Sequence, residues 1–198
     1  LLKSIDPVPV PGDPRRYGEV TGCGDIAAIA GWYFDDNSRN VYLYDVSTPQ
    51  SPKPLAVVPS TAAIWDVQIH GRYLYLAVQN QGYIDVFYLN DPAQPVLVNH
   101  LQPSDPPLDP HTFWVAGKGL YVASQNVQGV TIFDITNKRA PVFKGIFNTD
   151  FGMPHDNTVI HNKLYAAFIL YSPGLWTADV SDLSAPQSIA EAKYPGAG

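Results

Sequence analysis

The chain has 198 residues, of which 45% are hydrophobic, 15% are charged and 12% are aromatic. That hydrophobic fraction excludes a disordered chain, and the length allows one sizeable domain or two small ones. The net charge is −6 and no basic stripe is present, so we expect no nucleic-acid partner. Cys23 is the only cysteine, which excludes an intrachain disulfide framework. No apolar run approaches the ~18 residues of a membrane-spanning helix, so we expect no transmembrane segment.

One sequence phrase recurs four times along the chain. It has an aromatic residue (alanine in the last copy), a variable position, an aliphatic residue and a polar residue, with a proline five residues later. Its second position falls at residues 45, 88, 134 and 179, a period of about 45 residues that predicts one structural unit per copy. The copies are Tyr44-Asp45-Val46-Ser47 with Pro52, Phe87-Tyr88-Leu89-Asn90 with Pro95, Phe133-Asp134-Ile135-Thr136 with Pro141, and Ala178-Asp179-Val180-Ser181 with Pro186.

Two further phrases accompany these copies. A hairpin phrase with Gly or Asn at its turn spans 69–75, 115–121 and 160–165, with a weaker first copy at 29–34, and Gly82, Gly129 and Gly174 each begin an alternating run. In the third repeat these phrases predict strands over 112–116, 119–124, 129–135 and 142–147. Four strands in about 45 residues are typical of one blade of a β-propeller. No 3.6-residue period indicates a substantial helix.

The repeat boundaries predict one all-β propeller domain with four complete blades of four antiparallel strands. The blades are expected at 22–59, 60–104, 105–150 and 151–198, after an orphan outer strand of a preceding blade and a linker at 1–21. Four blades and an orphan strand do not close a ring by the usual strand exchange, and an unclosed blade leaves an apolar face uncovered. We therefore expect part of a larger propeller, completed by the same or another chain; a self-contained four-bladed ring is the alternative.

The repeated phrases resemble the LVIVD repeat, whose pattern is similar to GLxIxDVSDPxxP preceded by HDVxVxGxYAYVA. The resemblance rests on Tyr44-Asp45-Val46-Ser47-Thr48-Pro49, on Ala178-Asp179-Val180-Ser181-Asp182 and on the hairpin at 71–75, and it covers nearly the whole chain after Gly24. The second repeat departs, with Tyr88 in place of the usual Asp. The resemblance implies a bacterial or archaeal extracytoplasmic β-propeller and no single reaction.

Candidate metal ligands come from aligning the start of each innermost strand. Six residues before Gly31, Gly71 and Gly117 lie Asp25, Trp65 and His111, and His155 matches them in the fourth repeat. Equivalent positions of a propeller face a common axis, so His111, His155 and Asp25 could bind copper, zinc or iron at the channel mouth. The alternative is that each histidine only hydrogen-bonds the neighbouring blade. A weaker general likeness to selenium-binding-type propellers implies channel histidines that hold a metal.

Other polar residues have structural interpretations. His70 and His161 are expected in hairpin turns, and His100 on a solvated outer strand. The repeated Asp45, Asp134 and Asp179 allow a calcium hypothesis, but they lack the spacing of a calcium loop. We expect each of these carboxylates to accept backbone N–H bonds in the turn that follows.

Two functions remain open from the sequence. The first is a non-catalytic extracytoplasmic module for protein interaction or surface assembly, which binds a protein partner through loops such as 103–110 and 148–154 and requires no cofactor. The second is a metal-dependent oxidoreductase or hydrolase with His111 and His155 as ligands and with Asp25 or Asp156 as an acid–base group or third ligand. Loss of metal from His111→Ala or His155→Ala would separate the two.

Overall fold

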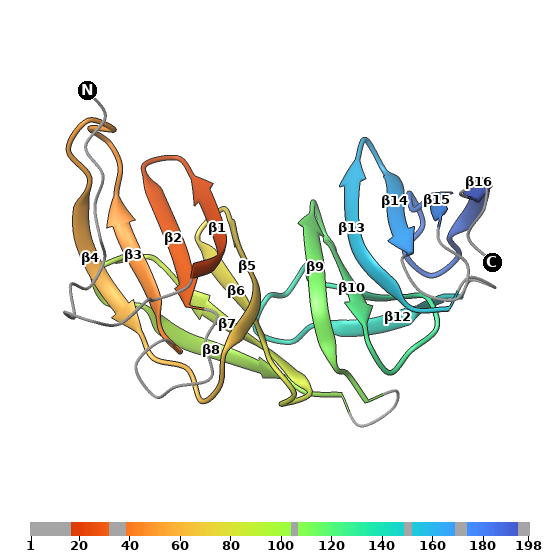
Figure 1. Cartoon of the computed structure of the whole chain (residues 1–198), viewed down its shortest axis with the longest axis horizontal. Helices are drawn as coiled ribbons and strands as arrows, with labels where there is room; N and C mark the ends of the chain where they lie inside the picture. Colours follow the sequence, from red (N-terminus) through yellow and green to blue (C-terminus); the bar gives the residue numbers. More distant parts are fainter. Residues whose placement is uncertain (1–16, 32–38, 104–106, 149–151, 169–173, 194–198) are drawn as a thin grey trace. The chain divides into compact units, whose positions relative to one another are not determined.

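The chain forms four β-sheets of four strands each, and no helix occurs in the residues that the structure describes (Figure 1). This computed structural model describes residues 17–31, 39–103, 107–148, 152–168 and 174–193. In every sheet the strands lie side by side in chain order, and neighbouring strands pair antiparallel, as β1 does with β2, β10 with β11 and β13 with β14. The expected all-β class with four-stranded antiparallel blades is thereby confirmed.

The strands have the following bounds. The first sheet contains β1 (Tyr17–Cys23), β2 (Ile26–Gly31), β3 (Val41–Asp45) and β4 (Lys53–Val58). The second contains β5 (Ile64–His70), β6 (Tyr73–Val78), β7 (Tyr83–Tyr88) and β8 (Val96–Leu101). The third contains β9 (Pro110–Ala116), β10 (Gly119–Ser124), β11 (Val130–Asp134) and β12 (Val142–Phe147), and the fourth contains β13 (Pro154–Ile160), β14 (Lys163–Phe168), β15 (Gly174–Asp179) and β16 (Gln187–Lys193).

The chain divides into two compact units, residues 1–79 with 85–98 and residues 80–84 with 99–198. In the first unit, β5 packs against β1 and β2 of the first sheet. In the second unit, β13 packs against β9 and β10 of the third sheet. The first sheet begins at Tyr17, before the expected boundary at residue 22, while the expected orphan strand at the start of the chain lies in 1–16, outside the described residues.

The hairpin that joins the first two strands of each sheet is the most regular feature of the repeat. Its first turn residue has a positive φ in every sheet: 59° at Gly24, 60° at Gly71, 57° at Gly117 and 49° at His161. Its second turn residue offers a carbonyl to the backbone N–H that follows the third strand, at 2.7–2.9 Å. These bonds run from Val46 to Asp25, from Leu89 to Arg72, from Ile135 to Lys118 and from Val180 to Asn162.

The inner strands share a β-bulge near their beginning. On β9 the pairing with β10 jumps from Pro110 to Thr112, so His111 is an extra residue without a partner in the ladder. The same jump leaves out Gly18 on β1, Trp65 on β5 and His155 on β13. A bulge bends the strand locally and redirects the side chain that it carries. All four sheets therefore direct one residue away from the ordinary pleat at equivalent positions.

An apolar core holds the third and fourth sheets of the second unit together. Its aromatic members include the buried Tyr121, Phe147 and Phe168, and Trp114 and Trp176 pack at its margin. The rings of Phe147 and Trp176 meet edge to face, with centroids 5.5 Å apart. Such contacts bury large apolar areas and fix the geometry between the two sheets.

The repeated aspartates stabilise the turn after each third strand. The Oδ1 atoms of Asp45, Asp134 and Asp179 accept the backbone N–H two residues later at 2.8–2.9 Å. The hydroxyl and backbone N–H of Ser47 lower the pKa of Asp45 below its usual value. The turn interpretation of these carboxylates is thereby confirmed.

Candidate functional site

The structure brings His111 and His155 into direct contact within the second unit. Each is the bulge residue of its inner strand and each directly follows a proline, Pro110 on β9 and Pro154 on β13. Their Nε2 atoms lie 3.2 Å apart, and their rings meet edge to face with centroids 4.7 Å apart. The imidazole of His111 is half-buried, whereas that of His155 is exposed. This contact matches the alternative prediction that each histidine hydrogen-bonds the neighbouring sheet, and metal binding by the pair stays a prediction.

The expected position of Asp25 is wrong. Asp25 would begin an inner strand only if Gly31 were the turn glycine of the first repeat. The turn glycine is Gly24, so Asp25 is the second, exposed residue of the hairpin turn between β1 and β2. The residue equivalent to His111 in the first sheet is Gly18, the bulge residue of β1.

Hydrogen bonds fix the two histidines to their surroundings. The side-chain amide nitrogen of Gln125 lies 3.2 Å from Nδ1 of His111, and the hydroxyl of Thr112 donates to the backbone carbonyl of His155 at 2.7 Å. With the Gln125 amide as donor, His111 carries its proton on Nε2 and donates it to Nε2 of His155. One hydrogen-bonded chain thus runs from the β10–β11 loop through both imidazoles.

The loop that carries Gln125 is held by the segment before β9. The backbone N–H of Gln125 donates to the carbonyl of Asp109, and the backbone N–H of Asp109 donates to Oγ of Ser124, both at 2.8 Å. The side-chain amide of Asn126 donates to the carbonyl of Pro107 at 3.0 Å. These bonds cross-link the two segments and place Gln125 beside His111.

Burial lowers the pKa of His111 below its ordinary value of 6.5, and the neighbouring His155 lowers it further. The carboxylates of Asp109 and Asp156 oppose this shift, because negative charge favours the imidazolium. The balance favours a neutral His111 at neutral pH. A neutral imidazole is the form that binds a metal ion or accepts a hydrogen bond.

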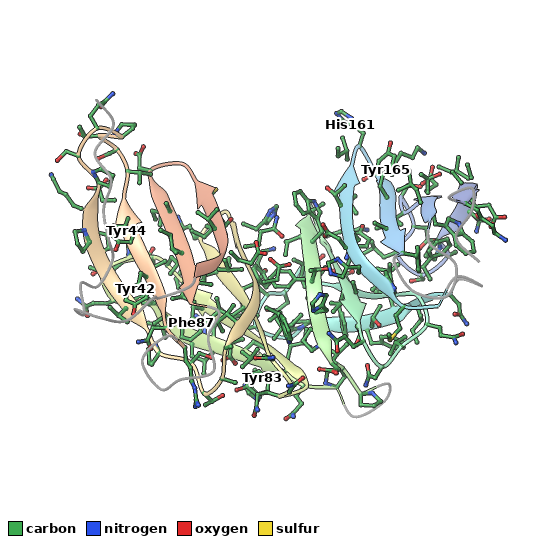
Figure 2. All side chains as sticks on the ribbon, in the orientation of Figure 1. Tyr42, Tyr44, Tyr83, Phe87, His161 and Tyr165 are labelled. Atoms are coloured by element: carbon green, nitrogen blue, oxygen red, sulfur yellow. The ribbon has the colours of Figure 1, made fainter. Side chains whose placement is uncertain are left out.

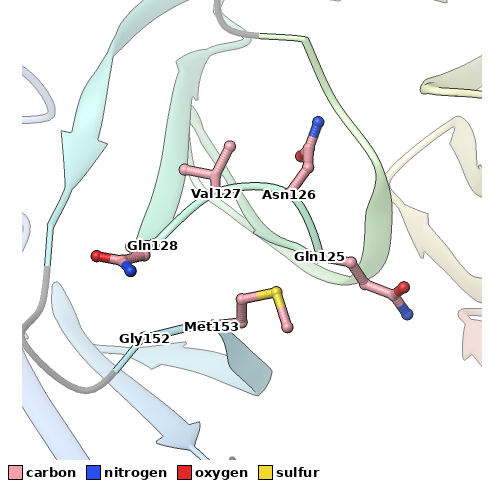
Figure 3. A pocket seen from close by; sticks show the side chains of 6 residues that line it. All are labelled: Gln125, Asn126, Val127, Gln128, Gly152 and Met153. Atoms are coloured by element: carbon pink, nitrogen blue, oxygen red, sulfur yellow. The ribbon is translucent and has the colours of Figure 1, made fainter.

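A pocket adjoins this pair at Gln125, which contacts His111 and also lines the pocket. It has a volume of about 410 Å³ and is lined by Gln125, Asn126, Val127, Gln128, Gly152 and Met153 (Figure 3). The backbone N–H of Gly129 donates to the carbonyl of Gly152 at 3.2 Å, which ties the loop to the segment before β13. Figure 3 shows the Met153 thioether beneath the loop. None of the lining residues is charged, so the pocket suits a neutral ligand.

Sequence reasoning missed Gln125 and Asn157. Gln125 begins the run Gln125-Asn126-Val127-Gln128-Gly129, which matches Gln79-Asn80-Gln81-Gly82 of the second repeat, but only the fold shows that its side chain lies beside His111. Asn157 is 4% exposed, and neither of its amide atoms has a hydrogen-bond partner among the described residues. The sequence did contain a signal for Asn157. It is a polar residue at the position where the inner strands β5 and β9 carry the buried Val67 and Phe113.

The remaining histidines have structural surroundings. His161 occupies the tip of the β13–β14 hairpin, where Figure 2 labels it, and His70 is the last residue of β5, directly before the turn at Gly71. The ring of His100 on β8 lies against that of Tyr83, with centroids 3.8 Å apart. The turn interpretation fits His161, whereas His70 lies on β5 and pairs with Tyr73. In the described ranges no group of three or more His, Cys, Asp or Glu residues could hold a metal ion, and no helix could cross a membrane.

Several solved structures resemble this chain. A protein from Lactobacillus plantarum has a TM-score of 0.71 at 14% identity, and the similarity covers 92% of this chain and 57% of that protein's chain. BamB from Moraxella catarrhalis has a TM-score of 0.63 at 16% identity, and the similarity covers 89% of this chain and 50% of the BamB chain. Both are β-propeller proteins, and the chain spans about half the length of each. At these identities the likeness shows the fold alone.

A third solved structure, the computationally designed Ika4 protein, has a TM-score of 0.61 at 9% identity. The similarity covers 88% of this chain and 98% of the Ika4 chain.

No curated protein matches the sequence. The LVIVD repeat family matches residues 63–102 and 111–149, which contain the second and third sheets. The chain therefore carries tandem LVIVD repeats, each folded as a four-stranded β-sheet of the propeller type.

Proposed function

We propose that this chain is a non-catalytic protein-interaction or surface-assembly module of an extracytoplasmic β-propeller protein. The observation that carries the proposal is the pocket of about 410 Å³ beside the β10–β11 loop. Loops held on a rigid sheet scaffold are the usual place of a binding surface. The extracytoplasmic location is supported by the LVIVD resemblance.

The chemistry of the pocket suits a short, uncharged peptide segment. The exposed side-chain amide of Gln128 both donates and accepts hydrogen bonds and so matches a peptide backbone, while the amides of Gln125 and Asn126 bond to His111, Pro107 and Ser124 and hold the loop in place. Val127 and Met153 supply apolar contact, and methionine adapts to ligands of different shape. The volume lies within the range of sites that bind small ligands or a few side chains.

The pocket is also preorganised for binding. The hydrogen bonds of Gln125, Asn126 and Gly129 fix the loop to the segments before β9 and β13. A loop that is already ordered loses less conformational entropy when a partner binds. This arrangement favours recognition by a preformed surface.

Site-specific photocrosslinking in the organism of origin tests this function. A photoreactive amino acid at the exposed Gln128 should give a discrete protein adduct. The matched control is the exposed Ala140, in the β11–β12 turn of the same sheet. The same adduct pattern at both positions, or no adduct at Gln128, would contradict the proposal.

A metal-dependent oxidoreductase or hydrolase remains the second candidate function. One observation favours it, the 3.2 Å separation of the Nε2 atoms of His111 and His155. A reaction would also need an acid–base group or a third ligand, for which Asp156, exposed beside His155, is the nearest candidate in sequence. The metal-binding part of this candidate can be tested separately.

A further inference from the structure

We propose that His111 and His155 chelate one divalent transition-metal ion through their Nε2 atoms, with Cu²⁺ bound more tightly than Zn²⁺. This site is distinct from the peptide-binding function proposed above and does not depend on it. Imidazole nitrogen is a preferred ligand of both ions, and copper(II) forms the more stable complexes with a given set of nitrogen ligands.

The separation of the two nitrogens fits a shared ion. Two nitrogens at ~2.0–2.1 Å from one tetrahedral zinc ion lie ~3.3 Å apart. The Nε2 atoms of His111 and His155 are 3.2 Å apart without any backbone movement. Both imidazoles therefore already have the spacing that chelation requires.

The backbone holds the pair in this position. Both histidines are bulge residues at equivalent places on β9 and β13, strands that pack against each other. The hydroxyl of Thr112 donates to the carbonyl of His155 and so links the two bulges at 2.7 Å. A site built on neighbouring strands is more precise than one built on loops.

Gln125 can stabilise the metal-bound form of His111. A histidine that binds a metal through Nε2 carries its proton on Nδ1 and donates it to a nearby acceptor. A flip of the Gln125 amide puts its oxygen at the position now given to nitrogen, 3.2 Å from Nδ1. The proton of His111 then moves from Nε2 to Nδ1, so the neutral pair accepts the ion without net proton release.

The local electrostatics also suit a cation. Asp109 and Asp156 place negative charge near His111.

Calorimetric titration of the full chain with CuCl₂ and with ZnCl₂ at neutral pH tests the proposal. We expect one Cu²⁺ per chain, weaker Zn²⁺ binding, and nitrogen hyperfine lines in the electron paramagnetic resonance spectrum of the copper form. His111→Ala and His155→Ala should each lower the affinity by about tenfold or more, because the second imidazole binds intramolecularly. Gln125→Ala should lower it less, since this residue acts through His111.

His161→Ala is the matched control, because His161 lies at the opposite, hairpin end of β13. It should leave copper affinity and the spectrum unchanged. If His111→Ala fails to fold, judged by circular dichroism, the exposed His155 carries the test alone. No saturable copper uptake by the unaltered chain, or the same affinity after His155→Ala, would overturn the proposal.

Discussion

The two ends of each inner strand differ in how strictly the repeat is kept. At the hairpin end, every sheet has a positive φ at the first turn residue and the same backbone hydrogen bond from the second. At the bulge end, the backbone irregularity is equally constant, but the residues are Gly18, Trp65, His111 and His155. Both ends thus repeat a backbone feature, but the first turn residue is glycine in three of the four sheets, whereas the bulge residue differs widely in size and polarity.

The hairpin end of each inner strand therefore serves the fold, whereas the bulge end can carry side chains with a function. The hairpin turn needs a particular backbone conformation, which restricts its first residue mostly to glycine. The bulge already leaves its residue out of the ladder, so the side chain there is free to change without losing a pairing. Substitutions that alter the backbone should therefore affect stability more than substitutions of the bulge residues.

The largest effect is expected from Gly129→Ala. Gly129 has a φ of 110°, and an added Cβ would lie 2.2 Å from the carbonyl oxygen of Phe147. The clash is with backbone and cannot be relieved by a side-chain rotation, so we expect the free energy of unfolding to fall by about 2–4 kcal/mol. Urea unfolding followed by tryptophan fluorescence measures this change.

Gly117→Ala is the matched control for that clash. Gly117 also has a positive φ, 57°, but an added Cβ meets nothing within 4 Å. Only the left-handed backbone is then unfavourable, and we expect a loss of about 1 kcal/mol. Equal losses for the two variants would show that the backbone conformation, rather than the close approach at Gly129, sets the effect.

The sequence predicted most of the scaffold because the scaffold repeats. In the third repeat, the expected strands at 119–124 and 142–147 match β10 and β12, and that at 112–116 differs from β9 only at its start. The first repeat was aligned on Gly31 instead of Gly24 because its hairpin phrase is weakly kept. That error moved Asp25 from the hairpin turn to the candidate site.

The candidate site could be predicted only in part. His111 and His155 occupy equivalent positions in adjacent repeats, so periodicity alone brought them together. Met153 lies in a segment that differs between repeats. Gln125 has a counterpart in Gln79, whose backbone N–H donates to the carbonyl of Ala63 as that of Gln125 does to Asp109, but the period does not show that the Gln125 side chain reaches His111. A repeat pattern thus predicts what the sheets have in common and misses the loops that distinguish them.

At the hairpin end of β13, we expect one substitution to stabilise the fold. His161 and Asn162 both have positive φ values, 49° and 59°, which a side chain with a Cβ adopts at a cost of about 1–2 kcal/mol per residue. His161→Gly should relieve this strain, offset partly by the greater freedom of glycine in the unfolded chain, for a net gain of about 0.5–1 kcal/mol. Thermal unfolding measures the gain. His161→Ala keeps a Cβ at the same φ, and an equal gain in that variant would contradict the explanation.

At the bulge end of the inner strand, we expect a substitution to cause only a small loss of stability. His155 is exposed, and His155→Ala removes one hydrogen bond to His111 and no partner in the ladder. We expect the free energy of unfolding to fall by about 0.5–1 kcal/mol, well below the effect of Gly129→Ala. Urea unfolding of the two variants under the same conditions makes the comparison. A loss as large as that of Gly129→Ala would show that the bulge residues are part of the scaffold.

The smallest expected effect is a pH dependence of stability from His111. Its pKa is lowered by burial and by His155, against the opposing charges of Asp109 and Asp156, so the folded chain favours the neutral imidazole. Above the ordinary value of 6.5 His111 is neutral in both states, and its contribution to stability is constant. As the pH falls below that value, the unfolded chain binds a proton before folded His111 does, and stability decreases until the folded group is protonated too. Urea unfolding across this range should show the decrease, and His111→Gln should reduce it.

His155→Ala removes the second cause of the shift, so the pKa of His111, followed by NMR, should rise towards its ordinary value. An unchanged His111 pKa in that variant would mean that burial alone sets the shift, and that the two imidazoles are less closely coupled than their 3.2 Å separation indicates.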